Sequence, residues 1–186
     1  SLSASFLREL IKMKKNIVAI YTLEKSKFNS DYTNLKPIAD NAKIPIFFAK
    51  DINSEKYVME ISKFKPDFIF CFGWSSILKE SILSIPKNGT IGFHPAQLPS
   101  NRGRHPIIWA LILGLKNTAS TFYLMDSDVD SGNLISQRIV QISMSDDAAS
   151  LYEKIRSVAL NQLKEFVPKL ESGVYKTFPQ DKSHVN

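Results

Sequence analysis

The chain has little cysteine and no long apolar run. Its 186 residues contain one cysteine, Cys71, so an internal disulfide is excluded. No apolar run reaches the roughly 20 residues that a membrane-spanning helix needs, and no charged-then-apolar leader opens the chain. We therefore expect a cytoplasmic protein with no membrane partner. Cys71 lies in the apolar stretch FIFCFG, where a buried small hydrophobic side chain is a better interpretation than a nucleophile.

The chain also lacks blocks of like charge, internal repeats and low-complexity tracts. Its net charge of +6 comes from lysines scattered along the whole length. This pattern favours attraction of anionic small molecules, and a nucleic-acid partner is not expected. With 44% hydrophobic residues and no linker-like change in composition, residues 1–186 are predicted to form a single domain.

Short apolar runs alternate with segments of helical spacing in the first half of the chain. Continuous apolar runs are typical of strands covered on both faces. Four are present: Asn16–Thr22, Ile44–Ala49, Asp67–Gly73 and Thr90–His94. Between them, apolar spacing predicts helices over residues 4–15 and 54–64. The alternation predicts an α/β fold, with a Rossmann-like, open, mostly parallel twisted sheet and helices on both faces.

The pattern continues after residue 105. Residues 105–115 are predicted to form an apolar helix with Pro106 in its first turn. Residues 119–125 and 133–142 are predicted to be strands on either side of a loop, and a long amphipathic helix is expected from about Asp146 to Glu171. At the two ends, the first strand of such a fold is missing and residues 175–186 resemble a truncated connection. We expect a domain trimmed at both ends.

His94 is the leading candidate for chemistry. It ends an apolar strand, and in open α/β sheets ligands bind beyond the carboxyl ends of strands. Asp130 lies in the loop between the next two predicted strands. An imidazole can donate a hydrogen bond to a carbonyl oxygen as it becomes an oxyanion, and a carboxylate can take up a proton from an attacking amine. Acyl transfer is one interpretation; a structural histidine beside an ordinary Asp-Ser-Gly turn is the other.

A dozen residues resemble, in order, the motif of the folate-dependent formyltransferase family. That family includes glycinamide ribonucleotide, methionyl-tRNA and sugar-nucleotide N-formyltransferases. The stretches GFHPAQLPSNRGRHPIIWALILGL and TASTFYLMDSDVDSGNLISQ carry the resemblance, and the looser match covers nearly the whole chain. The matching residues are His94, Pro95, Leu98, Pro99, Arg102, Gly103, Pro106, Trp109, Ala110, Thr121, Asp130 and Gly132.

The resemblance implies transfer of the formyl group of 10-formyltetrahydrofolate to a primary amine, with no metal ion. In the family an asparagine, a histidine and an aspartate assist, and His94 and Asp130 match two of the three. The residues implied to contact the folate are Trp74, Ser75, Ser76, Ile77 and Leu78, together with Ser127, Asp128 and Val129. Backbone amides there would bind the edge of the pterin and apolar side chains its faces; core packing is the alternative for Trp74.

Gly92 departs sharply from the motif. The asparagine of the family stands two residues before the histidine, where this chain has Gly92. Loss of an oxyanion donor typically costs about 10²–10³ in rate. Gln97, Asn101, His105 or a water molecule entering the space beside glycine are the candidate replacements. Gly92 also keeps two alternatives open: a formyltetrahydrofolate hydrolase, and a non-catalytic relative that binds folate or nucleotide.

The Ser-Asn-Arg-Gly-Arg-His-Pro loop is most similar to bacterial formyltransferases that act on amino sugars linked to nucleotides. The implied acceptor is therefore a sugar nucleotide, with Gln97, Asn101, Arg102 and Gly103 on the acceptor side. An arginine here can hold a phosphate, although solvated arginines are the alternative. Members of the sugar class often form dimers, so the resemblance allows a homodimer without requiring one.

Overall fold

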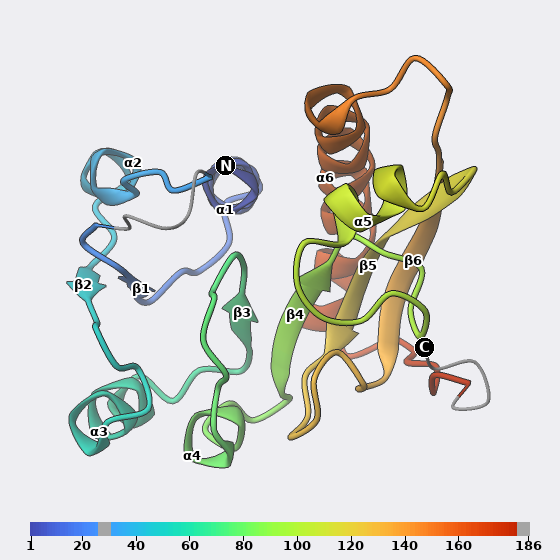
Figure 1. Ribbon diagram of the computed structural model, residues 1–186. Coiled ribbons are helices and arrows are strands. Elements are labelled where there is room, and N and C mark those ends of the chain that lie inside the picture. Colours follow the sequence, from blue (N-terminus) through green and yellow to red (C-terminus); the bar gives the residue numbers. More distant parts are fainter. Residues whose placement is uncertain (26–30, 182–186) are drawn as a thin grey trace. The chain divides into compact units, whose positions relative to one another are not determined.

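Residues 1–90 and 91–186 form two separate units in the computed structural model, which describes residues 1–25 and 31–181 (Figure 1). The division falls between Thr90 and Ile91, at the start of strand β4 (Thr90–His94), which carries Gly92 and His94.

Helices and short strands alternate in the first unit. Strands β1 and β2 pair in parallel, with Ile20 opposite Ile46 and Thr22 opposite Phe48. The elements, in chain order, are α1 (Leu2–Lys12), β1 (Ile20–Thr22), α2 (Lys36–Ala42), β2 (Ile46–Phe48), α3 (Glu55–Lys63), β3 (Ile69–Cys71) and α4 (Glu80–Leu83).

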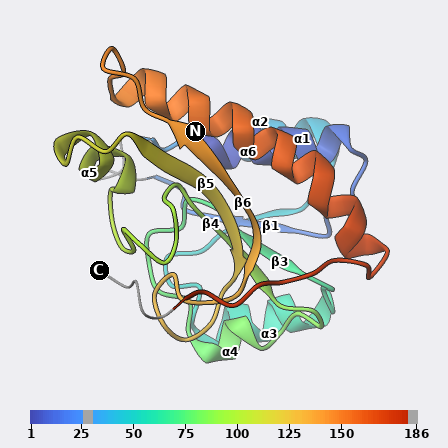
Figure 2. The same cartoon turned by 90° about the vertical axis from the view of Figure 1, so that its right-hand side faces the viewer.

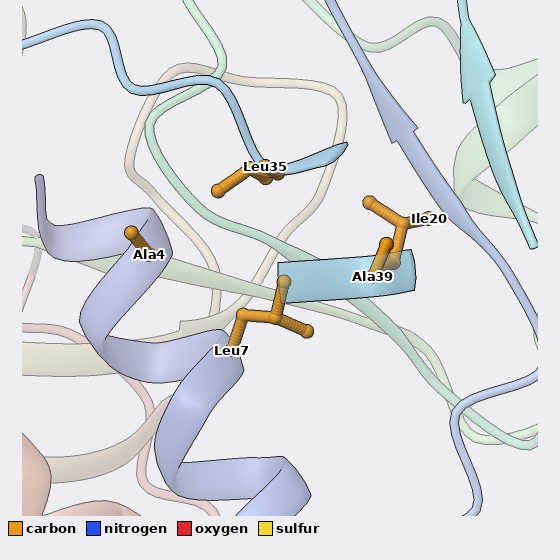
Figure 3. Close-up of a cluster of buried hydrophobic side chains, with 5 residues drawn as sticks. All are labelled: Ala4, Leu7, Ile20, Leu35 and Ala39. Atoms are coloured by element: carbon orange, nitrogen blue, oxygen red, sulfur yellow. The ribbon is translucent and has the colours of Figure 1, made fainter. Parts of the chain in front are cut away.

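A small apolar cluster joins α1, α2 and β1 (Figure 3). Helix α1 begins at Leu2 because the hydroxyl of Ser1 accepts a hydrogen bond from the amide of Ala4. Its apolar spacing then places Ala4 and Leu7 on one face, against Leu35, Ala39 and Ile20. The contact explains why the amphipathic pattern predicted this helix correctly.

Cys71 makes the first unit sensitive to high pH. The residue is half-buried, and desolvation of its thiol raises the pKa to about 12. In the unfolded chain a thiol has a pKa of about 8.5, so the folded state holds this proton more tightly. The resulting stabilisation is complete below about pH 8.5 and is lost progressively as the pH rises towards 12.

We therefore expect the wild-type free energy of unfolding to fall by about 1–2 kcal/mol more than that of Cys71→Ala between pH 7 and pH 10. Urea denaturation of both proteins at the two pH values measures this difference. Equal losses in the two proteins would show that the thiol does not contribute.

The second unit is an antiparallel sheet with one long helix against it. Strand β4 pairs with β5, and β5 with β6, both antiparallel. Figure 2 shows α6 lying along β5 and β6. The elements are β4 (Thr90–His94), α5 (Pro106–Ile112), β5 (Asn117–Leu124), β6 (Leu134–Gln141) and α6 (Ala148–Glu171).

Helix α6 begins directly after two aspartates, Asp146 and Asp147. The carboxylate of Asp147 accepts a hydrogen bond from the amide of Ser150, whose hydroxyl accepts one from the Asp147 amide, so the two form a capping box. Leu151 and Ile155 then pack with Val140 of β6. In the described part of the chain, no helix is long and apolar enough to cross a bilayer.

The alternation of helices and strands predicted from the sequence is confirmed, with shorter elements in the first unit. The predicted strand at residues 16–22 is reduced to Ile20–Thr22, and the long helix begins at Ala148 rather than near Asp146. Helices α2 and α4 were not predicted, because seven and four residues are too few to show a helical period.

Candidate active site

The pairing of β4 with β5 places four residues on one face of the second unit. Gly92 lies opposite Tyr123, and His94 lies opposite Thr121. Because side chains alternate along a strand and directly paired residues share a face, all four face the same side of the sheet. His94 is only 5% exposed, so its ring is held by protein contacts rather than by solvent.

Both ring nitrogens of His94 face oxygen atoms. Nε2 lies 2.8 Å from the carbonyl oxygen of Asn101, which can only accept, so Nε2 carries a proton. Nδ1 lies 3.5 Å from Oδ2 of Asp130. A proton added at Nδ1 would therefore face a carboxylate, and the pair can store one proton as an imidazolium beside an anion.

Asp130 is held at both carboxylate oxygens. Oδ2 accepts a hydrogen bond from the amide of Gly103 at 2.9 Å, and Oδ1 accepts one from the hydroxyl of Tyr123 at 2.6 Å. Its backbone has φ +52°, in the left-handed region that few residues other than glycine adopt. These contacts orient the carboxylate of Asp130 towards His94, which lies 36 residues earlier in the sequence.

The loop between β4 and α5 wraps around this pair. Gly103 has φ +94°, which glycine adopts without strain, and its amide thereby meets Asp130. An added Cβ there would touch nothing within 4 Å, so the conformation rather than a close approach requires glycine. Gln97 and His105, two candidates for the missing donor, are exposed. Asn101, the third candidate, faces His94 with its backbone carbonyl oxygen, which is an acceptor.

Arg102 connects the loop to the end of the chain. Its guanidinium donates to Oε1 of Gln180 at 2.6 Å, and Nε2 of Gln180 donates to the carbonyl oxygens of Asp130 and Gly132 at 2.9 and 2.8 Å. Phe178 anchors this end by two backbone hydrogen bonds to Leu134. Of residues 175–186, which were predicted to be a truncated connection, Gln180 contacts the site, and residues 182–186 lie outside the described part of the chain.

Sequence reasoning missed Tyr123 and Gln180. Tyr123 lies in a predicted strand, but its position opposite Gly92 depends on the pairing of that strand with Thr90–His94, which was not predicted from the sequence. Gln180 carries no comparable signal, since a glutamine in a polar tail has no periodicity and no motif neighbour.

The space beside Gly92 is already filled. A Cβ on this glycine would lie 2.8 and 2.9 Å from ring atoms of Tyr123 and 2.9 Å from Cγ of Met125. Real side chains do not approach so closely, so an asparagine would not fit without displacing the tyrosine. The expectation that glycine leaves room for a water molecule there loses its basis.

The two predicted folate segments are each defined within their own unit. In Trp74–Leu78, Asn53 donates to the carbonyl of Ile77 and accepts from the amide of Lys79, and the indole N–H of Trp74 is buried without a hydrogen-bond partner. In the second unit, Ser127, Asp128 and Val129 are exposed in the loop before Asp130. Their role in binding stays a prediction.

The chain matches the family model described as "Formyl transferase" over residues 4–167. It is 38% identical over 137 residues to the bifunctional polymyxin resistance protein ArnA of Wigglesworthia glossinidia brevipalpis, covering 74% of this chain and 21% of that one. It is 31% identical over 185 residues to the methionyl-tRNA formyltransferase of Kosmotoga olearia, covering 97% and 60%. The chain thus spans a fifth and three fifths of these relatives.

A solved structure of the N-formyltransferase from Helicobacter canadensis, in complex with folinic acid and dTDP-3-aminofucose, is similar in fold. It has a TM-score of 0.76 at 19% identity and covers 100% of this chain and 66% of that one. The likeness confirms the predicted α/β fold class. Since the family model matches residues 4–167, a range that includes His94 and Asp130, this chain belongs to the formyl transferase family.

Proposed function

We propose that this protein transfers the formyl group of 10-formyltetrahydrofolate to the primary amine of an amino-sugar nucleotide. The observation that carries the proposal is the contact between His94 and Asp130, in a chain that belongs to the formyl transferase family. Support for the acceptor comes from the Helicobacter canadensis enzyme, whose complex holds folinic acid and a dTDP-linked amino sugar.

In the proposed reaction the acceptor nitrogen attacks the formyl carbon and a new C–N bond forms. The bond from that carbon to N10 of the folate then breaks, and N10 takes up a proton. The proton lost by the amine goes to the carboxylate of Asp130, whose Oδ2 lies 3.5 Å from Nδ1 of His94, and this proton then passes to N10 as the leaving group. The N–H at Nε2 is the donor to the developing oxyanion, and this requires the carbonyl of Asn101 to give way.

The donor would bind against groups that suit a heterocycle. Trp74 offers a buried N–H without a partner, and Ile77 offers an apolar side chain that is 70% exposed. An unpaired buried donor is costly unless a ligand satisfies it. In this proposal Arg102 contacts the acceptor, and its Nε is buried without a hydrogen-bond partner.

Release of tetrahydrofolate from 10-formyltetrahydrofolate tests the proposal. Parallel reactions would contain no amine, glycinamide ribonucleotide, methionyl-tRNA or one of a panel of amino-sugar nucleotides. We expect release to depend on an amino-sugar nucleotide, because the amine is the nucleophile. Equal release without any amine would identify a hydrolase, and no release in any reaction would identify a binding protein; either result contradicts the proposal.

A further inference from the structure

Tyr123 and Gly92 are complementary in shape across the β4–β5 pair. They are directly opposed in the strand register, and Tyr123 is 4% exposed. Its ring lies where a side chain at position 92 would begin, with ring atoms 2.8 and 2.9 Å from the place of a Cβ. The tyrosine ring can occupy this place only because residue 92 is glycine.

The hydroxyl of Tyr123 acts on the carboxylate beside His94. It donates to Oδ1 of Asp130 at 2.6 Å, while Oδ2 of the same group accepts from Gly103 and faces Nδ1 of His94. A phenol has one proton to donate, and Asp130 receives it here. Tyr123 is therefore not a donor to the formyl oxygen in this arrangement, and its influence on the reaction passes through Asp130.

Hydrogen bonds to a charged acceptor are stronger and more directional than neutral ones. With Oδ1 bound by Tyr123, the carboxylate cannot rotate to exchange its two oxygens without breaking this bond and the bond from Gly103. The side chain opposite Gly92 thus restricts which oxygen faces the imidazole.

We propose that Tyr123 is a positioning residue of the formyl-transfer site: its ring, seated on Gly92, holds Asp130 so that one carboxylate oxygen faces His94. This inference rests on the proposed function. The inference deepens the proposed function by assigning a role to Gly92, which stands where the family motif has an asparagine.

The test compares Tyr123→Phe with the wild-type protein. Phenylalanine keeps the ring on Gly92 and removes only the hydroxyl, so the fold should be retained. We expect kcat to fall about tenfold or more, since a hydrogen bond to a charged group is lost. The KM for the folate donor should stay unchanged, because the hydroxyl that is removed is bound to Asp130 and Tyr123 is buried. An unchanged kcat would overturn the proposal.

Tyr57→Phe is the matched control. The hydroxyl of Tyr57 also donates a hydrogen bond to an oxygen, the carbonyl of Phe48, and Tyr57 has no part in the hydrogen bonds around His94 and Asp130. It should leave kcat unchanged. An equal loss of kcat in both variants would mean that removal of any tyrosine hydroxyl has this effect, and would overturn the proposal.

A second variant, Gly92→Ala, tests the seat of the ring. The added methyl displaces Tyr123, so kcat should fall in the wild-type background. In the Tyr123→Phe background it should cause little further loss, because the hydroxyl through which the ring acts is already absent. Fully additive losses of kcat would show that Gly92 and Tyr123 act independently, and would contradict the proposal.

NMR of the isotope-labelled imidazole nitrogens separates this inference from the proposed function. The signals of His94 should move in Tyr123→Phe and not in Tyr57→Phe, whether or not formyl transfer occurs. If the wild-type protein transfers no formyl group, the proposed function fails and the NMR comparison decides the inference alone. Unmoved His94 signals in Tyr123→Phe would then overturn it.

Discussion

Replacement of His94 by alanine should lower kcat by about 10²–10⁴, the usual contribution of a positioned acid or base. The ring is the only group in the described site that both faces Asp130 and carries a donor at its other nitrogen. Alanine removes the oxyanion donor and leaves the carboxylate of Asp130 without the imidazole that it faces. Initial rates of tetrahydrofolate release with saturating donor and acceptor measure the loss.

His105→Ala is the control for this variant. His105 lies at the start of α5, on the loop that follows His94, and its side chain is exposed. The change therefore removes an imidazole that does not face Asp130. It should keep kcat within a small factor of wild type. If His94→Ala keeps its rate while His105→Ala loses it, the donor has been assigned to the wrong histidine and the proposed mechanism is wrong.

Gly132→Ala should be the most destabilising single-methyl substitution among the glycines of the second unit. A Cβ at this position would lie 1.7 Å from the carbonyl oxygen of Leu124 and 2.8 Å from its carbon. A backbone atom paired in the β5–β6 hairpin cannot move aside as a side chain can, because the amide of Leu124 is also bound to Asn133. We expect a loss of at least about 3 kcal/mol in the free energy of unfolding.

Urea denaturation measures this loss, with Gly114→Ala as the matched control. Gly114 has φ +61° and open space around an added methyl, so its replacement should cost only about 1 kcal/mol for backbone strain. Equal midpoints for Gly132→Ala and wild type would show that the hairpin can relax around the methyl. The loss should be accompanied by loss of activity, because Gly132 also binds Gln180 beside Asp130.

Position 92 shows how one residue can be predicted in sequence and explained only in structure. The motif identified the glycine as a departure, and the chain alone suggested several donors to replace the asparagine. Of these, Gln97 and His105 are exposed, and Asn101 presents its backbone carbonyl, an acceptor, to His94. The group that occupies the place is Tyr123, which belongs to another strand and is brought there by register alone.

The sequence by itself determined the alternation of helices and strands, because apolar period and length are local properties that α1, β5 and α6 express strongly. It also determined the family, since the ordered motif around His94 is a property of spacing. Only the tertiary structure decided which groups hold Asp130. Tyr123, Gly103 and Gln180 lie 7, 27 and 50 positions from it, and hydrogen bonds over such separations depend on strand register and loop path, which leave no local pattern.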